Sequence, residues 1–196
     1  MEKGGCATAL GAAGITTGDH LAWADEMRVG LVGVVRRVWA PVGVKVRQQV
    51  QKVREWRYLV MAIEVLAGRL WWCWTDTMQS EEIAGVVRGW QQNSNLEAVV
   101  WDGASSHRSQ VVQEVGFSLV QQPAYAPELN PAERFFEELR RVVEGKVYDT
   151  IDAKVAAIEA ELQDWDADPD RVCRLVSWPW IMDTLNQLPG PGTSAA

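Results

Sequence analysis

The sequence predicts an α/β fold in which strands and helices form separate layers. Apolar runs of strand length come first, between about residues 21 and 75, and amphipathic helices come late, from residue 131 onward. Between them a strand, a short helix and another strand alternate. This order is typical of a mixed sheet covered by helices. A chain of 196 residues is also long enough for one domain with a substantial core.

The first half of the chain supplies most of the predicted strands. Residues 21–25 alternate large and small side chains and end in Asp25, which predicts a strand with that acid at its C-terminal end. Residues 42–47 alternate Val with Gly, Lys and Arg, which predicts a half-exposed strand with a basic face. Two apolar runs, 58–65 and 70–75, flank Ala67-Gly68 and predict a hairpin of buried strands.

The middle of the chain alternates between helix and strand. Ser80 precedes a predicted helix with Ile83, Val86, Val87 and Trp90 on one face. Residues 96–101 predict a buried strand that ends at Asp102. A short helix over 109–115 and a strand over 117–120 are expected next.

The last third is predicted to be helical. After a loop with several prolines over 121–130, Pro131 suits the first turn of a helix whose apolar residues fall on one side. A second amphipathic helix begins near residue 151, and a third begins at Pro169 and is interrupted near Pro179. We expect residues 1–20 to be a flexible lead-in, residues 21–188 to be the folded domain, and residues 189–196 to be a flexible tail.

Composition favours a protein of the cytoplasm. Hydrophobic residues make up 47% of the chain and charged residues 23%, as in globular proteins rather than disordered ones. No apolar run has the length of a membrane span, and the N-terminus lacks a basic and then apolar leader, so no membrane partner is expected. The three cysteines are isolated, which fits a reducing compartment and argues against a disulfide framework or a zinc site.

Charge is distributed unevenly along the chain. The net charge is −7, yet residues 28–57 hold eight basic residues against one acid, and residues 149–170 hold eight acids against one lysine. A basic face of this kind can bind a polyanion while the acidic segment remains solvated. An ordinary solvated surface is the alternative for both segments. Within the basic one, the candidate residues for binding a polyanion such as DNA are Arg36, Arg37, Lys45 and Arg47.

Three acids are candidates for a metal site. Asp25 and Asp102 each end a predicted apolar strand, where a charge is unexpected unless it faces a cleft. Carboxylates at neighbouring strand ends can bind hard cations such as Mg²⁺, although many such acids merely begin a turn. Glu133 follows Asn130-Pro131 in the pattern of a helix capping box. A capping role and a metal-binding role are compatible at one helix start.

The sequence around these acids is more specific than the acids themselves. Residues 99–109 read VVWDGASSHRS, and residues 122–134 read QPAYAPELNPAER. Upstream, residues 23–26 read WADE and residues 37–43 read RVWAPVG. Together these motifs resemble the catalytic core of the mariner-like superfamily of transposases, in particular its bacterial insertion-sequence branch. The resemblance runs from about Leu21 to Gln187.

The resemblance implies a ribonuclease-H-like fold, a central mixed sheet flanked by helices, with three acids meeting at one edge. Asp25, Asp102 and Glu133 match the family's metal-binding triad, which implies two Mg²⁺ or Mn²⁺ ions and the cleavage and strand transfer of DNA. Gly103 stands where the family usually has Asn, which removes a polar side chain beside the metals. His107 matches a family histidine and is a candidate DNA contact; a hydrogen-bonded turn residue is its alternative role.

The partners implied are DNA, both the ends of a mobile element and its target, and a second copy of the chain as a homodimer. Transposases of this kind usually read their DNA ends with helix-turn-helix modules, which residues 1–20 are too short to encode. We therefore expect a separate DNA-reading chain or a missing N-terminal domain, and association with the nucleoid.

Two other interpretations are open. One is a different ribonuclease-H-like nuclease, such as a resolvase or integrase, which the segment ending in Glu133 disfavours. The other is a catalytically silent transposase remnant that binds DNA or protein, which Gly103 and the acidic net charge favour modestly. A metal-dependent DNA nicking assay separates an enzyme from a remnant.

Overall fold

The sheet has five strands and both parallel and antiparallel pairings. A computed structural model describes residues 4–17, 20–33, 38–122 and 130–190. In this part of the chain the strand order is β3-β2-β1-β4-β5. The strands are β1 (Leu21–Gly30), β2 (Trp56–Glu64), β3 (Arg69–Thr75), β4 (Ala98–Trp101) and β5 (Ser118–Gln121). The first three pair antiparallel, and β4 and β5 join β1 in parallel.

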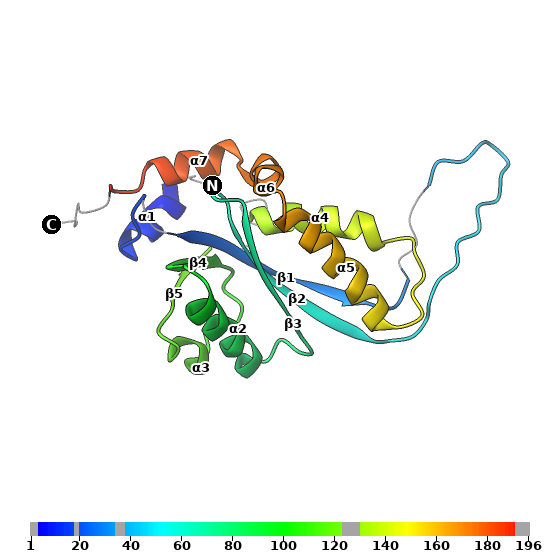
Figure 1. The fold of residues 1–196 in the computed structure, drawn as a ribbon, viewed down its shortest axis with the longest axis horizontal. Helices are drawn as coiled ribbons and strands as arrows, with labels where there is room; N and C mark the ends of the chain where they lie inside the picture. The colour runs from blue at the N-terminus through cyan, green and yellow to red at the C-terminus, as the bar shows by residue number, and fades with distance from the viewer. Residues whose placement is uncertain (1–3, 18–19, 34–37, 123–129, 191–196) are drawn as a thin grey trace.

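Helices cover the two faces of this sheet unequally (Figure 1). One face carries α4 (Pro131–Val143) and α5 (Ile151–Asp166), with α1 (Gly4–Ala12), α6 (Pro169–Val176) and α7 (Pro179–Asn186) toward one end. The other face carries α2 (Ser80–Asn93) and α3 (Gln110–Gln113). Two separate apolar cores result, one on each face.

Alternation along β1 decides which side chains reach which core. Trp23 and Met27 lie in the core beneath α4 and α5, whereas Ala22 and Ala24 lie in the core beneath α2. Successive side chains of a strand point to opposite faces. The side chain of Asp25 therefore points to the face of the sheet that carries α4, and the side chain of Glu26 points to the face that carries α2.

The helices follow the predicted periodicity. The four residues expected on one face of α2 are all buried. In α4, Pro131 occupies the first turn, and Phe135, Phe136 and Leu139 are fully buried. Phe135 packs edge-on against Trp165 of α5, with 5.1 Å between the ring centroids. The predicted interruption near Pro179 separates α6 from α7.

The hairpin between β2 and β3 turns at a glycine, as expected. Gly68 has a left-handed backbone with φ of +63°, and a Cβ there would lie only 2.1 Å from the carbonyl oxygen of Pro169. Glycine is required on both counts. This contact holds the hairpin turn against the start of α6.

Three expectations about local structure are wrong. Residues 4–12 form helix α1, in which Leu10 is fully buried, so this part of the expected flexible lead-in is packed. Strand β1 does not end at Asp25 but continues to Gly30, because Met27 and Val29 are also buried. Residues 42–47 form no strand, since their alternating valines find no partner strand and are exposed.

Residues 38–55, which we call the arm, leave the body of the molecule between β1 and β2 (Figure 1). The arm contains neither helix nor strand. It exposes large apolar side chains, among them Val38, Trp39 and Val42. Across the part of the chain that the structure describes, no helix is both long and apolar enough to cross a membrane.

Candidate functional site

Strand pairing brings two of the predicted acids to adjacent positions. Strands β1 and β4 pair in parallel, with Trp23 opposite Val100. Continuing this register by two residues places Asp25 beside Asp102, which directly follows the last residue of β4. Because Trp23 and Val100 lie in the same core, both acids belong to the α4 face of the sheet.

Asn130 fixes the third acid near the same strand. Its side-chain oxygen accepts a hydrogen bond from the Ala132 amide at 3.0 Å, which caps α4. Its side-chain nitrogen donates to the carbonyl oxygen of Ala24 at 2.9 Å. Asn130 is 3% exposed, so both bonds are shielded from water. The first turn of α4, with Glu133, is thereby tied to β1 one residue before Asp25.

The pKa of Asp25 reflects its burial and the acids near it. Burial is the main reason why the pKa of its carboxyl is raised to about 7. A hydrogen bond of 2.8 Å from the amide of Glu26 acts in the opposite direction. The negative charges of Glu26, Glu133 and Asp102 then raise the pKa further. Glu133 and Asp102 therefore both lie near enough to Asp25 to raise its pKa, although the three acids come from three different parts of the fold.

A buried histidine joins the two faces of the sheet at this edge. His107 is 5% exposed and lies between two carboxylates. Its Nδ1 is 2.7 Å from Oδ1 of Asp102, and its Nε2 is 2.8 Å from Oε1 of Glu26. The ring also stacks on Trp101, with 4.0 Å between the centroids.

This arrangement favours the charged form of the histidine. Burial lowers the pKa of His107, but the contacts with Asp102 and Glu26 outweigh it and raise the pKa to about 9. The same contact with His107, together with the Ala104 amide, lowers the pKa of Asp102. Asp102 is thus held as a carboxylate by an imidazolium. The role of His107 as a DNA contact stays a prediction; its observed neighbours are carboxylates.

Glu133 is partly exposed and contacts a basic side chain of its own helix. Its side chain is 43% exposed and lies 3.9 Å from the guanidinium of Arg140, two turns along α4. As the described side chains stand, no three His, Cys, Asp or Glu residues are grouped closely enough to hold a metal ion. The donor set nevertheless fits a hard divalent cation, because three carboxylates share one region and Asp25 is destabilised as an anion there.

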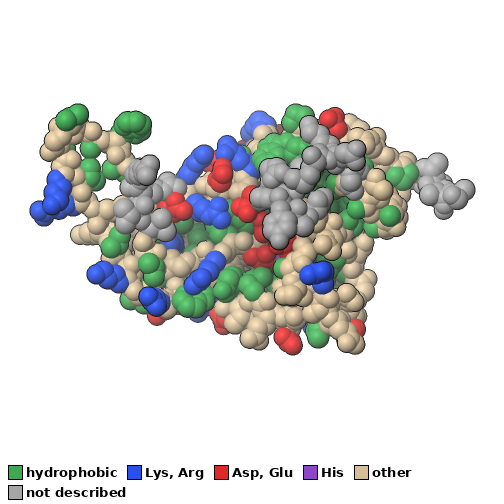
Figure 2. All heavy atoms as spheres, turned by 180° about the vertical axis from the view of Figure 1, so that it is seen from behind, with side chains coloured by type: hydrophobic (Ala, Val, Ile, Leu, Met, Phe, Trp, Pro, Cys, Tyr) green, Lys and Arg blue, Asp and Glu red, His purple; other side chains and the backbone are tan. Residues whose placement is uncertain are grey.

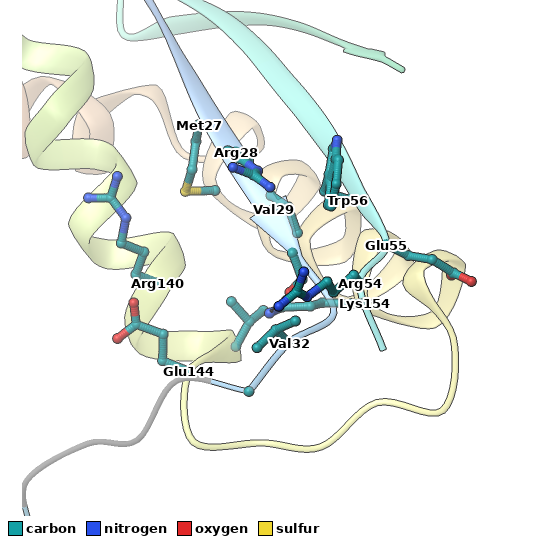
Figure 3. A pocket seen from close by; sticks show the side chains of 13 residues that line it. Met27, Arg28, Val29, Val32, Arg54, Glu55, Trp56, Arg140, Glu144 and Lys154 are labelled. Carbon is teal, nitrogen blue, oxygen red and sulfur yellow. Dashed lines mark hydrogen bonds between the residues drawn. The ribbon is translucent and has the colours of Figure 1, made fainter. Parts of the chain in front are cut away.

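A cavity with several basic side chains lies between β1, β2 and α4 (Figure 3). It measures about 560 Å³ and is bounded by the end of β1, the start of β2 and the end of α4. Arg28, Arg54, Arg140 and Lys154 line it, with Glu55 and Glu144 among them. Arg28 stacks on the Trp56 ring at 4.3 Å, and Lys154 donates a 2.7 Å hydrogen bond to the carbonyl oxygen of Gly30.

The predicted basic residues lie on or near the arm. Lys45 and Arg47 are both exposed on it, whereas Arg36 and Arg37 lie outside the described residues. Seen from behind, the molecule shows Lys and Arg side chains spread over the arm and the adjoining face, with acidic side chains between them and nearby (Figure 2).

Sequence reasoning missed Glu26, because strand alternation places it on the opposite face of the sheet from Asp25. The alternation is correct, but Glu26 still reaches the site through His107. The signal available was the pair Asp25-Glu26 together with a histidine five residues after Asp102. Helical spacing alone could have placed Arg140 on the same face of α4 as Glu133, but its position beside Arg28 depends on the fold.

Comparison with known proteins gives a family and a fold. The model of the DDE superfamily endonucleases matches residues 20–153. Among solved structures, the chain is similar to the Mos1 mariner paired-end complex with Mn, with a TM-score of 0.64 and 15% identity over 94% of this chain and 61% of that one. It is similar to the Mos1 transposase paired-end complex with left transposon end, with a TM-score of 0.62 and 12% identity over 94% and 59% of the two chains.

The catalytic domain of Mos1 mariner transposase also matches, with a TM-score of 0.55 and 13% identity over 86% of this chain and 78% of that one. The expected ribonuclease-H-like fold, a mixed sheet flanked by helices, is thereby confirmed. The chain spans about 60% of the length of the transposases in the paired-end complexes. No curated protein matches it in sequence. The bacterial insertion-sequence branch stays a prediction.

Proposed function

Because the chain belongs to the DDE superfamily endonucleases, we propose that it is the catalytic domain of a mariner-like transposase. It would cut DNA strands and join them to new sites with divalent metal ions, two of them, held by Asp25, Asp102 and Glu133. The observation that supports this proposal is that Asp25 and the end of β4 lie on paired strands, and that the start of α4, which carries Glu133, is tied to β1 beside Asp25.

The chain's own residues prepare the site in different ways. Mg²⁺ or Mn²⁺, when bound, would activate the attacking water or 3′-hydroxyl and stabilise the departing oxygen of the phosphodiester. Asp25 and Asp102 project from paired strands of a buried sheet, which fixes their spacing. Glu133 stands on an exposed helix turn, so a change of its side-chain rotamer away from Arg140 would bring it toward the other two acids.

His107 and Glu26 keep Asp102 ready to bind a cation. The imidazolium favours the ionised form of Asp102, and Glu26 on its other side favours the charged form of the ring. A metal ligand must be deprotonated, so this pair maintains the required state of Asp102. Asp25, with its raised pKa, would be ionised by the approach of the cation itself.

The basic cavity and the arm supply a surface for the DNA backbone. Arg140 lies between the acids and the cavity, since it is near Glu133 and also lines the cavity with Arg28 and Arg54. Guanidinium groups bind phosphates through paired hydrogen bonds. We therefore infer that a strand cut at the triad continues across Arg140 toward the arm. A separate DNA-reading domain or chain and a homodimer stay predictions.

The test is nicking of supercoiled DNA in Mg²⁺, Mn²⁺ or EDTA by wild type and by Asp102→Asn. We expect metal-dependent cutting by wild type and a loss of several orders of magnitude in the variant, because the metals supply most of the charge stabilisation. Asp166→Asn, at the exposed far end of α5, is the matched control and should cut normally.

Substantial cutting by Asp102→Asn would show that the triad is misassigned. Binding of DNA without any cutting by wild type would favour the alternative, a catalytically silent remnant. Cutting without any capacity to join a 3′-hydroxyl end to target DNA would favour another ribonuclease-H-like nuclease.

A further inference from the structure

The side chain of Gln121 fills the space beside Gly103 at the edge of the site. A Cβ built on Gly103 would lie 2.4 Å from Nε2 of Gln121 and 3.0 Å from its Cδ. Gln121 is the last residue of β5 and pairs with Trp101, two residues before Gly103. The carboxamide of Gln121 therefore lies where a side chain of residue 103 would begin.

The backbone of Gly103 does not itself demand glycine. It is absent from the left-handed glycines of the described chain, so an L side chain could adopt its conformation. The obstacle is the side chain of Gln121 alone. An asparagine at position 103, which the family resemblance would lead one to expect, would therefore meet the side chain of Gln121.

The Gln121 amide is placed to act on a ligand. Together with Asp102, His107 and Arg108 it lines a cavity of about 370 Å³. The residue is exposed, and no hydrogen bond of its side chain is found within the described residues. A carboxamide offers two N–H donors, which can bind the oxygens of a phosphate.

We propose that Gln121 binds the scissile DNA strand, by donating its side-chain amide to a phosphate oxygen beside Asp102, in place of the asparagine that Gly103 replaces. This inference rests on the proposed function. It also accounts for Gly103 without loss of activity, because the amide is supplied from β5 instead of from residue 103.

The experiment is a mutant cycle between the two positions, measured as single-turnover nicking in Mg²⁺ and as affinity for nicked DNA in EDTA. Q121A should lose about 10- to 100-fold in kcat/KM, the usual effect of one hydrogen bond to a charged group. G103N should push the flexible Gln121 side chain aside and supply its own amide, so its activity should remain near wild type.

The decisive comparison is Q121A in two backgrounds. Once G103N is present, the additional Q121A change should have little effect, because the amide no longer comes from Gln121. G103A is the matched control, since it occupies the same space without an amide. The double variant G103A/Q121A should therefore remain as impaired as Q121A, while G103N/Q121A recovers. Melting temperatures of all variants should stay within a few degrees of wild type.

Two results would overturn the proposal. One is a Q121A variant with wild-type cutting and wild-type DNA affinity. The other is a loss from Q121A that is equally large with and without G103N. If the wild-type chain does not cut, the proposed function fails, and the same cycle read as DNA affinity still decides the role of Gln121.

Discussion

Asp25 and Glu26 show how two adjacent acids take different environments. Asp25 faces the α4 side, where burial and neighbouring acids disfavour its charge. Glu26 faces the α2 side and contacts an imidazolium. Composition and spacing alone could identify both as acids on a strand. Which of the two contacts His107 could not be read from the sequence, because His107 is 81 residues away from Glu26 and is brought there by the fold.

Asp25 should make the metal-free protein less stable as the pH rises. Its folded-state pKa of about 7 lies above the unfolded value, so the folded state holds the proton longer and stability falls between about pH 4 and pH 7. Asp25→Asn removes this penalty and retains an oxygen for the Glu26 amide. By linkage the variant should gain on the order of 2–4 kcal/mol at pH 8.

Urea unfolding of both proteins in EDTA between pH 5 and 8 measures this difference. The gain should shrink toward pH 5 and also when Mg²⁺ is added, because the cation stabilises the wild-type carboxylate. A variant that is less stable than wild type at pH 8 would show that Asp25 is not destabilised by its surroundings. Nicking should be lost in the variant in either case.

His107 should stabilise the folded protein, whereas Asp25 destabilises it. Its pKa is raised to about 9, so the stability it contributes is complete below about pH 6.5 and is lost as the pH rises through 9. His107→Gln should therefore destabilise the protein by roughly 1–3 kcal/mol at pH 6 and by less at pH 9.5. Proton NMR of the imidazole signals gives the pKa directly. Glu26→Gln should lower that pKa, and an unchanged value would rule out the ion pair between Glu26 and His107.

At the scale of elements, helix α4 combines features that the sequence reveals with one that it hides. The Asn130-Pro131 start and the apolar stripe were readable, because capping and helical periodicity are local. The hydrogen bond from Asn130 to Ala24 was not, because it spans 106 residues. Strand β1 was cut short in the prediction although Glu26 and Arg28 alternate with Met27 and Val29, a pattern that favours a strand; pairing with β2 confirms that the strand continues.

Asn130 can be tested by separating its two bonds. Asn130→Ala removes both the cap and the partner of Ala24, and should destabilise the protein by about 2–3 kcal/mol. Asn130→Asp keeps the cap acceptor and loses the donor to Ala24, so it should retain more stability. Both should reduce nicking, because α4 loses its tie to β1 near Asp25. Thermal unfolding and a nicking assay measure the two effects. Normal cutting by Asn130→Asp would show that the tie to Ala24 does not position Glu133.

At the scale of the whole molecule, charge is segregated more strongly than the fold requires. The basic segment 28–57 runs through the end of β1, the arm and the start of β2, whereas the acidic segment 149–170 lies mainly on α5. The sequence showed this segregation directly. It did not show that residues 38–55 would project as an arm. The alternation of Val42, Val44 and Val46 is typical of a strand, but these residues pair with no other strand and are exposed.

DNA affinity should therefore come mainly from residues 28–57. The rest of the chain sums to −14, from −7 overall and +7 in this segment, and repels phosphates. Each phosphate contact releases counterions, so log affinity should fall with log salt at a slope of roughly −0.9 per contact. Contacts to phosphates carry no sequence information, so binding should be weak and nearly non-specific. Changing Arg36, Arg37, Lys45 and Arg47 together to Glu should nearly abolish binding and flatten the slope.

The control variant should change the net charge by the same amount at residues outside the arm. Lys45→Glu with Arg47→Glu alters the net charge by the same amount as Arg69→Glu with Arg88→Glu, and all four side chains are exposed. The first pair lies on the arm, and the second lies on β3 and α2. If local phosphate contacts dominate, the first pair weakens binding several-fold more than the second in filter-binding titrations at several salt concentrations. Equal losses would mean that only net charge matters and that the arm holds no DNA.

Tight, sequence-selective binding by the unaided chain would also contradict the prediction, because it would require base contacts that phosphate-binding side chains do not provide.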